Sequence, residues 1–332
     1  EGVMKSPILW VVVDPEQEWL SRVHVKQPEH MWINMLTKER SVARQLDAVK
    51  GLQHHFLQDS LVSLNALIAC AEDDKVFWGV RAEALHAIAG AAGEGTAWAG
   101  MDFLLRFYRK RCIDPETGQP RTNDFTDVAE HFVTQSVPGA FAVLRDATGY
   151  TPAEVVELLL YMLESNDNSG NRLDDDNLRA AMLEALGRMR PPTQEHLEKA
   201  VVEIERQLHY DRLLPSLHNI VSVAAVQALT DLALGIPVGK KAVAGLRRVL
   251  NGCVTPGTYH GLRREARRGM LRLTGWEVGA DEMLKALLYQ LEHEPHRGVR
   301  AGLVADTAAL LRPGGRVAHE LVSAGDGDGE DG

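Results

Sequence analysis

Cysteine is scarce in this sequence, which has three in 332 residues. Cys70, Cys112 and Cys253 stand far apart, and an odd number cannot all pair with one another. Small disulfide-stapled proteins instead carry an even number of cysteines at short spacings. The sequence therefore argues against a disulfide framework and favours a reducing compartment such as the cytosol or the nucleus.

Long apolar runs are also missing. No stretch of about 18 apolar residues occurs, which is the length that a membrane-crossing helix needs, so no membrane partner is expected. The sequence begins at Glu1 without the charged-then-apolar leader of a secreted protein, so we expect no signal peptide. Because an apolar run begins almost at once, at Ile8, we expect this chain to be a fragment of a longer protein.

The motifs of common enzymes are absent too. Zinc peptidases use His-Glu-x-x-His, and the nearest string, residues 293–296, is one residue too short and contains a helix-breaking proline. His54 and His55 are adjacent, so their side chains point apart on a helix. Residues 235–241 lack the spacing and the Ser or Thr of a phosphate loop, and no Gly-x-Ser-x-Gly occurs. We therefore expect no enzyme, metal site, cofactor or small-molecule substrate in this chain.

The composition is ordinary for a soluble globular protein, with 45% hydrophobic and 25% charged residues. The net charge of −10 gives no reason to expect tight binding of nucleic acid by the chain as a whole. Its length exceeds what one core usually serves, but a repeat protein escapes that limit because it grows in one direction.

A nine-residue pattern with small residues at fixed places recurs along the chain. It is clearest at Val80–Ile88. Close copies begin at residues 178 and 221, and looser copies begin at residues 41, 262 and 299. The spacing fits the unit of about 40–47 residues of HEAT or armadillo repeats, with two units between residues 80 and 178. The fold class predicted is mainly α, a HEAT/armadillo-like α-solenoid of antiparallel helix pairs with a short N-terminal β-strand segment.

Helical periodicity and capping residues locate the helices. They are expected over residues 31–36, 39–53, 60–71, 77–92, 98–111, 125–146, from 152, from 176, 193–214, 216–234, 240–250, 263–273, 281–293 and 297–311.

Three domains are predicted from the same patterns. Residues 1–30 contain two strand-like runs, Ile8–Val13 and Arg22–Lys26, and should be the end of a β-sandwich that lies upstream. Residues 31–312 should form the helical solenoid. Residues 313–332 end in a Gly-Asp-rich stretch and should be a flexible acidic tail.

One part of the chain is strongly basic despite the negative total. Between residues 240 and 272 Glu265 is the only acidic residue. On neighbouring helices the lysines and arginines of this stretch could form a basic ridge that binds DNA phosphates or an acidic partner protein. The alternative is that they form a helix face that only contacts water. The ridge consists of Lys240, Lys241, Arg247, Arg248, Arg263, Arg264, Arg267, Arg268 and Arg272. A smaller patch consists of Arg106, Arg109, Lys110, Arg111 and Arg121.

The first 190 residues carry a series of landmarks in a fixed order. They are Ser6–Pro15, Glu18-Trp19, Val23–Pro28, Met31-Trp32, Glu39-Arg40, Ala43–Val49, Phe77–Leu85, Thr122–Phe125, Val137-Pro138, Ala142–Asp146, Asn166–Asn168 and Asp176–Ala180. In this series the sequence resembles the second-subunit family of the general transcription factor TFIID, at the junction of its β-sandwich and its HEAT-like helical region.

The resemblance implies a nuclear, non-catalytic scaffold. Such a subunit would support assembly of the RNA polymerase II pre-initiation complex and recognition of the core promoter. Its partners would be other TFIID subunits and promoter DNA. Because that family is similar in architecture to zinc aminopeptidases of the gluzincin type, with the peptidase-like domain upstream, no catalytic or metal residue is carried over. Two alternatives stay open, namely the C-terminal helical domain of an active zinc aminopeptidase and a general HEAT adaptor.

Overall fold

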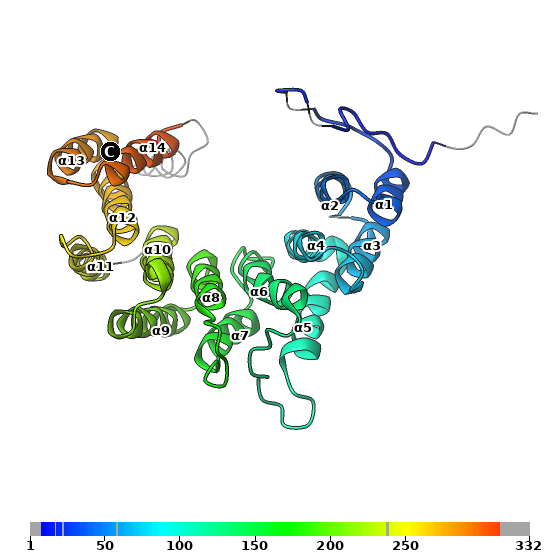
Figure 1. The fold of residues 1–332 in the computed structure, drawn as a ribbon, viewed down its shortest axis with the longest axis horizontal. Coiled ribbons are helices and arrows are strands. Elements are labelled where there is room, and N and C mark those ends of the chain that lie inside the picture. The colour runs from blue at the N-terminus through cyan, green and yellow to red at the C-terminus, as the bar shows by residue number, and fades with distance from the viewer. Residues whose placement is uncertain (1–7, 17, 22, 58, 237–238, 313–332) are drawn as a thin grey trace, which may run out of the picture. The chain divides into compact units, whose positions relative to one another are not determined.

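Helices make up most of the chain. A computed structural model describes residues 8–312 apart from 17, 22, 58, 237 and 238. Within that part, fourteen α-helices follow one another in antiparallel pairs, and no residue belongs to a β-strand (Figure 1). Every helix expected from the sequence is present, so the mainly α repeat fold is confirmed. The helices form two compact units, which divide after Asp174.

Unit 1 is built around α4. This helix packs against α2, α3 and α6. Leu85 and Ile88 of α4 are fully buried, as is Phe141 of α6. The helices of this unit are α1 (Glu29–Lys38), α2 (Val42–His55), α3 (Leu61–Glu72), α4 (Trp78–Gly90), α5 (Ala99–Cys112), α6 (Val128–Ala142) and α7 (Ala153–Glu164).

Unit 2 is built around α10 in the same way. This helix packs against α8, α9 and α12, and most of its residues are buried. A second small core joins α12, α13 and α14 through Leu271, Met283 and Leu303. The helices of this unit are α8 (Asp176–Arg188), α9 (Gln194–Leu213), α10 (Ile220–Gly235), α11 (Lys240–Gly252), α12 (His260–Val278), α13 (Ala280–His293) and α14 (Arg297–Leu310).

Several helices begin where the sequence supplies a capping side chain. Ser60 Oγ accepts a hydrogen bond from the Ser63 N–H at 3.2 Å at the start of α3. Asp127 accepts one at 3.0 Å at the start of α6, and Thr193 accepts one at 3.3 Å at the start of α9. Each cap satisfies a backbone donor that the helix itself leaves free, which fixes where the helix starts.

By length and composition alone, the stretch Leu217–Gly235 could cross a membrane. Most of it, however, is buried inside unit 2, between α8, α9 and α12. Asp231 also lies on this helix and forms an ion pair with Arg272. The apolar character of α10 is therefore explained by its central position in the repeat, where both sides of the helix are covered.

The prediction of two N-terminal strands from the sequence was wrong. In the described residues neither run forms a strand, and Arg22 itself lies outside them. The Val11 N–H donates to the side-chain Oε1 of Gln27 at 3.1 Å, and no backbone ladder forms. The Arg44 guanidinium of α2 donates to the carbonyl of Asp14 at 2.8 Å. A strand needs a partner strand, and these side-chain contacts hold the segment without one.

The extended N-terminal segment leaves large apolar side chains in solvent. Its exposed residues are Ile8, Leu9, Val11, Val13, Trp19, Leu20 and Val23. That residues 1–30 belong to a β-sandwich stays a prediction. The predicted acidic tail, residues 313–332, lies outside the described residues.

The contact between α8 and α10 gives a first testable prediction. A Cβ on Gly187 would stand 2.5 Å from the Ala228 Cα, so Gly187→Ala must push two helices apart. We expect its free energy of unfolding in urea to fall by about 1–3 kcal/mol.

Gly245→Ala on α11 is the matched control, because nothing lies within 4 Å of the added Cβ. This helix-interior change should raise the free energy of unfolding by about 0.5–1 kcal/mol. Equal effects at both glycines would show that the α8–α10 contact does not limit side-chain size.

Candidate functional site

The predicted basic ridge falls on two helices of unit 2 that pack against each other. Lys241, Arg247 and Arg248 lie on α11, and the arginines from Arg263 to Arg272 lie on α12. The side chain of Lys240 lies outside the described part of the structure. The cations are thus neighbours along the fold, and the surroundings of each side chain decide what it can bind.

Two of the ridge arginines point into the protein and share one carboxylate. Glu294, just after α13, is fully buried and lies 3.0 Å from Arg263 Nη2 and 2.9 Å from Arg267 Nε. Arg263 also donates to the backbone carbonyl of Thr258 at 2.8 Å. These guanidinium groups join α12 to the end of α13, so they hold the fold together and are not presented to solvent.

The electrostatics of this cluster favour an ionised Glu294. Burial alone would raise the pKa of Glu294. The hydrogen bond from the His296 N–H, at 3.0 Å, and the charges of Arg263 and Arg267 act in the other direction, and the pKa lies below its ordinary value. The carboxylate is therefore stabilised by its partners more than it is penalised by burial.

A second buried pair connects the middle of unit 2. Arg272 Nη1 of α12 lies 2.6 Å from Asp231 Oδ1 of α10, and both side chains are more than nine-tenths buried. Nearby, Arg268 lies 3.3 Å from Glu265, whose pKa is raised chiefly by burial. The first pair joins α12 to α10, and the second lies within α12, so each neutralises a ridge cation with an acid of this chain.

Two further ridge arginines, Arg264 and Arg247, form pairs nearer the surface. Arg264 lies 2.8 Å from Asp306 on α14, and Arg247 pairs with Glu277 at the end of α12. Of the ridge side chains that the structure describes, Lys241 and Arg248 are the two exposed ones with no partner. Free positive charge is thus confined to a small part of the ridge, on α11.

Sequence reasoning missed the acids that face this ridge. Within residues 240–272 Glu265 is the only acid, but the fold brings Asp231, Glu277, Glu294 and Asp306 to it from outside that window. A local count of charges cannot see residues that lie 30–40 positions away. The repeat period itself was the available signal, because residues one repeat apart occupy neighbouring helices.

Three of the five cations in the smaller basic patch of unit 1 form ion pairs, whereas Arg106 donates to the backbone carbonyl of Asp102 at 3.2 Å. Arg109 lies 3.0 Å from Glu154, and Lys110 lies 3.8 Å from Glu72. Arg111 pairs with Glu130 and lies over the ring of Phe107, 3.7 Å from its centroid. Glu130 also binds the buried Arg81 at 2.8 Å.

The histidines weighed as metal ligands do not come together. The rings of His54 and His55 are 6.5 Å apart. In the string 293–296, Glu294 is turned inward, and His296 Nδ1 accepts from the Val299 N–H at 3.3 Å as the cap of α14. Across the residues described here, no group of three His, Cys, Asp or Glu side chains is placed to hold a metal ion.

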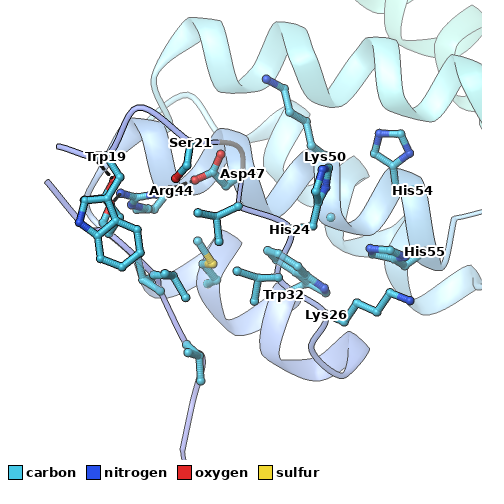
Figure 2. Close-up of a pocket in the computed structure, with 18 residues that line it drawn as sticks. Trp19, Ser21, His24, Lys26, Trp32, Arg44, Asp47, Lys50, His54 and His55 are labelled. Carbon is cyan, nitrogen blue, oxygen red and sulfur yellow. Dashed lines mark hydrogen bonds and ion pairs between the residues drawn. The ribbon is translucent and has the colours of Figure 1, made fainter. Parts of the chain in front are cut away.

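A pocket of about 570 Å³ lies in unit 1 between the extended N-terminal segment and helices α1 and α2. In Figure 2 the labelled Lys26, Lys50 and His55 lie on one side of it, and Trp19 and Arg44 on the other. The buried indole N–H of Trp32, which also lines the pocket, has no hydrogen-bond partner in this region of the structure. Lys26 and Lys50 thus place two cationic side chains on one side of the pocket.

The fold of the described residues is that of an all-α helical-repeat protein. The protein-family model described as TAF2-like, TPR repeats matches residues 29–313, and the chain belongs to this family. The matched range begins at the first residue of α1.

Curated relatives carry the name transcription initiation factor TFIID subunit 2. The Drosophila melanogaster protein is 29% identical over 317 residues, which cover 90% of this chain and 25% of the relative. The Schizosaccharomyces pombe protein is 29% identical, and that of Danio rerio 30% identical, each over 68% of this chain and 20% of the relative. The chain thus spans about a fifth to a quarter of the length of these relatives.

Among solved structures, the complex of CpcE and CpcF of phycocyanin lyase from Nostoc is similar with a TM-score of 0.44 and 18% identity. The similarity covers 89% of this chain and 99% of the other. A likeness this loose carries no conclusion about function.

The buried Glu294 cluster gives a second prediction. Glu294→Gln leaves two buried guanidinium groups without their anion, so the free energy of unfolding at pH 7 should fall by about 3–5 kcal/mol. Because the folded-state pKa of Glu294 is lowered, this contribution is present above the ordinary value of 4.5. The difference between the two proteins should shrink as the pH falls through the folded-state pKa, in urea titrations from pH 7 to pH 3.

Glu282→Gln serves as the matched control, since Glu282 pairs with Lys285 in solvent at the surface of α13. This change should leave the unfolding midpoint where it is. A Glu294 effect no larger than that of Glu282, or one that grows at low pH, would contradict the assignment.

Proposed function

We propose that this chain is the helical part of a non-catalytic scaffold subunit of transcription initiation factor TFIID. The observation that carries the proposal is its membership of the TAF2-like family over residues 29–313, with relatives named as TFIID subunit 2. It works in the nucleus, where it holds other TFIID subunits and supports assembly of the RNA polymerase II machinery at a promoter.

The internal ion pairs support a holding role. Repeat proteins bury a continuous core between neighbouring helices and leave long outer surfaces for partners. In unit 2, Arg272–Asp231 ties α12 to α10 and Arg263–Glu294 ties α12 to the end of α13, which keeps such surfaces fixed in place. A rigid surface loses less conformational freedom when it binds a partner.

The repeats are of the HEAT type in this proposal. In unit 2 the alternate helices α8, α10, α12 and α14 begin at spacings of 44, 40 and 37 residues. These spacings exceed the 34 residues of a TPR unit and fit the longer HEAT or armadillo unit.

Promoter DNA is a second ligand in this proposal, bound by the ridge through α11. Lys241 and Arg248 stand seven residues apart on α11, so they share one face of the helix, and both are exposed. Exposed cations of this kind neutralise phosphates without reading the bases. Arg247 of the same helix pairs with Glu277 of α12, which holds α11 in place.

The scaffold role is tested by affinity purification. Full-length protein with an affinity tag, and a version that lacks residues 29–312, are isolated from nuclear extract and their bound proteins are identified by mass spectrometry. We expect the intact protein to recover other TFIID subunits and the deletion to lose some of them. Recovery of the same subunits by both proteins would refute a role for the helical region.

The DNA contact is tested by charge reversal. Lys241→Glu with Arg248→Glu should weaken binding of duplex promoter DNA and lower the slope of log affinity against log salt by about 2, one for each lost phosphate contact. Binding is measured by fluorescence anisotropy across a salt series.

Lys38→Glu with Lys75→Glu is the matched control, because both lysines are exposed in unit 1 and the change in net charge is the same. It should leave affinity and slope close to those of the unaltered protein. Equal losses in the two double variants would show that only net charge matters and would refute a site on α11.

A further inference from the structure

The loop between α9 and α10 presents three leucines to solvent within five residues. Leu213, Leu214 and Leu217 are 70%, 83% and 72% exposed. Pro215 lies among them and Tyr210, just before them, is also exposed. Single exposed leucines are normal on a protein surface, but a group of large apolar side chains in so short a segment is typical of an interaction site.

A buried carboxylate fixes the shape of this loop from inside. Asp211 is fully buried, and its Oδ1 accepts a hydrogen bond from the Ser216 N–H at 2.8 Å. Its Oδ2 accepts from the N–H of Ser222 at 3.0 Å and from the Ser222 hydroxyl. The Val221 N–H donates in turn to Ser216 Oγ at 3.2 Å. The last turn of α9, the loop and the first turn of α10 therefore form one connected hydrogen-bond network.

The far end of the loop is held in an unusual backbone conformation. His218 and Asn219 have φ angles of 55° and 50°, in the left-handed region that residues other than glycine seldom occupy. The His218 ring stacks on Tyr259 at the start of α12, with centroids 5.6 Å apart. Two such residues in succession persist where the surroundings enforce them, and such residues cluster at functional sites.

The segment that carries the leucines has one exposed cation, Arg212, and no exposed carboxylate. From His209 to Asn219 the chain carries Arg212 and the exposed histidines His209 and His218, and its single carboxylate, Asp211, is buried in the loop network. An acidic surface would therefore meet no exposed carboxylate of this segment.

We propose that this leucine loop, residues 210–219, is a preformed docking element for another protein. The partner is a protein with an apolar groove that takes the leucines, rimmed by carboxylates that face Arg212 and His218. The fixed backbone lowers the entropy that binding costs, and apolar anchors buried in a pocket supply most of the affinity of such contacts. The proposal rests on the scaffold role above and adds to it the surface used and the chemistry of the partner.

The partner is identified by photo-crosslinking in the full-length protein. p-Benzoylphenylalanine is placed at position 214 and, as a control, at Val202, which is 65% exposed on α9 outside the loop. After irradiation in nuclear extract, the crosslinked peptides are sequenced by mass spectrometry. We expect position 214 to label a peptide of a different protein that combines apolar residues with Asp or Glu, and position 202 not to label it.

Other labelling results overturn the proposal. These are no adduct above the level of position 202, a polar or basic peptide, a second copy of this protein, and another segment of the same polypeptide. The first result would mean that the leucines face water in the cell, and the last that they are covered from within the longer chain.

Removal of the apolar side chains provides an independent measurement. Leu213→Ser, Leu214→Ser and Leu217→Ser together should lower recovery of the labelled partner at least about tenfold, with the thermal unfolding midpoint unchanged because the leucines are exposed. Val202→Ser should leave recovery unchanged. Full recovery by the triple variant overturns the proposal.

These results separate the two proposals. A labelled acidic-apolar peptide from a protein outside TFIID would support the leucine loop and count against the TFIID role. Recovery of TFIID subunits by the intact protein together with full recovery by the triple variant would count against the loop alone.

Discussion

The close approach of α8 and α10 is the constraint on which unit 2 depends. Gly187 faces the backbone of α10 at a distance that leaves no room for a methyl group. That contact brings α10 deep enough for most of its residues to be buried between α8, α9 and α12. Since a single helix pair of a repeat protein cannot bury its apolar face, each pair is stable only as part of the stack.

Charge is used within the repeats to connect helices that are apart in sequence. Glu294 holds two arginines of α12, and Asp231 of α10 holds a third. Asp211 plays the same part for backbone donors of the loop before α10. Buried ions of this kind are expensive unless fully partnered, so they fix the register of neighbouring helices more than they add to total stability.

This use of charge decides what the surface offers to partners. Most arginines of the ridge are paired with carboxylates of this chain, which leaves Lys241 and Arg248 on α11 as the exposed cations without a partner among the ridge side chains described. The exposed leucines of the α9–α10 loop lie on a different element of the same unit. The proposed DNA contact and the proposed protein contact therefore lie on separate elements of unit 2.

The helices were predictable because their signals are local. Periodic apolar residues and caps such as Ser60, Asp127 and Thr193 lie within the helix they define, and all fourteen expected helices are present. The two strands were not predictable, because Ile8–Val13 has the composition of a strand but no partner strand in the described residues. Strand formation depends on a second segment, and composition does not supply one.

By itself, then, the sequence determined the helical-repeat fold, the positions of its helices and the family resemblance, since each depends on patterns that are a few residues to one repeat long. Only the tertiary structure decided which cations are free, because their acids come from 30 or more residues away. It also decided that Leu213, Leu214 and Leu217 face solvent. The sequence places Leu213 and Leu214 at the end of one helix and Leu217 at the start of the next, without saying which side they face. The buried Asp211 fixes the connection between the two helices through its hydrogen bonds from the Ser216 and Ser222 N–H groups.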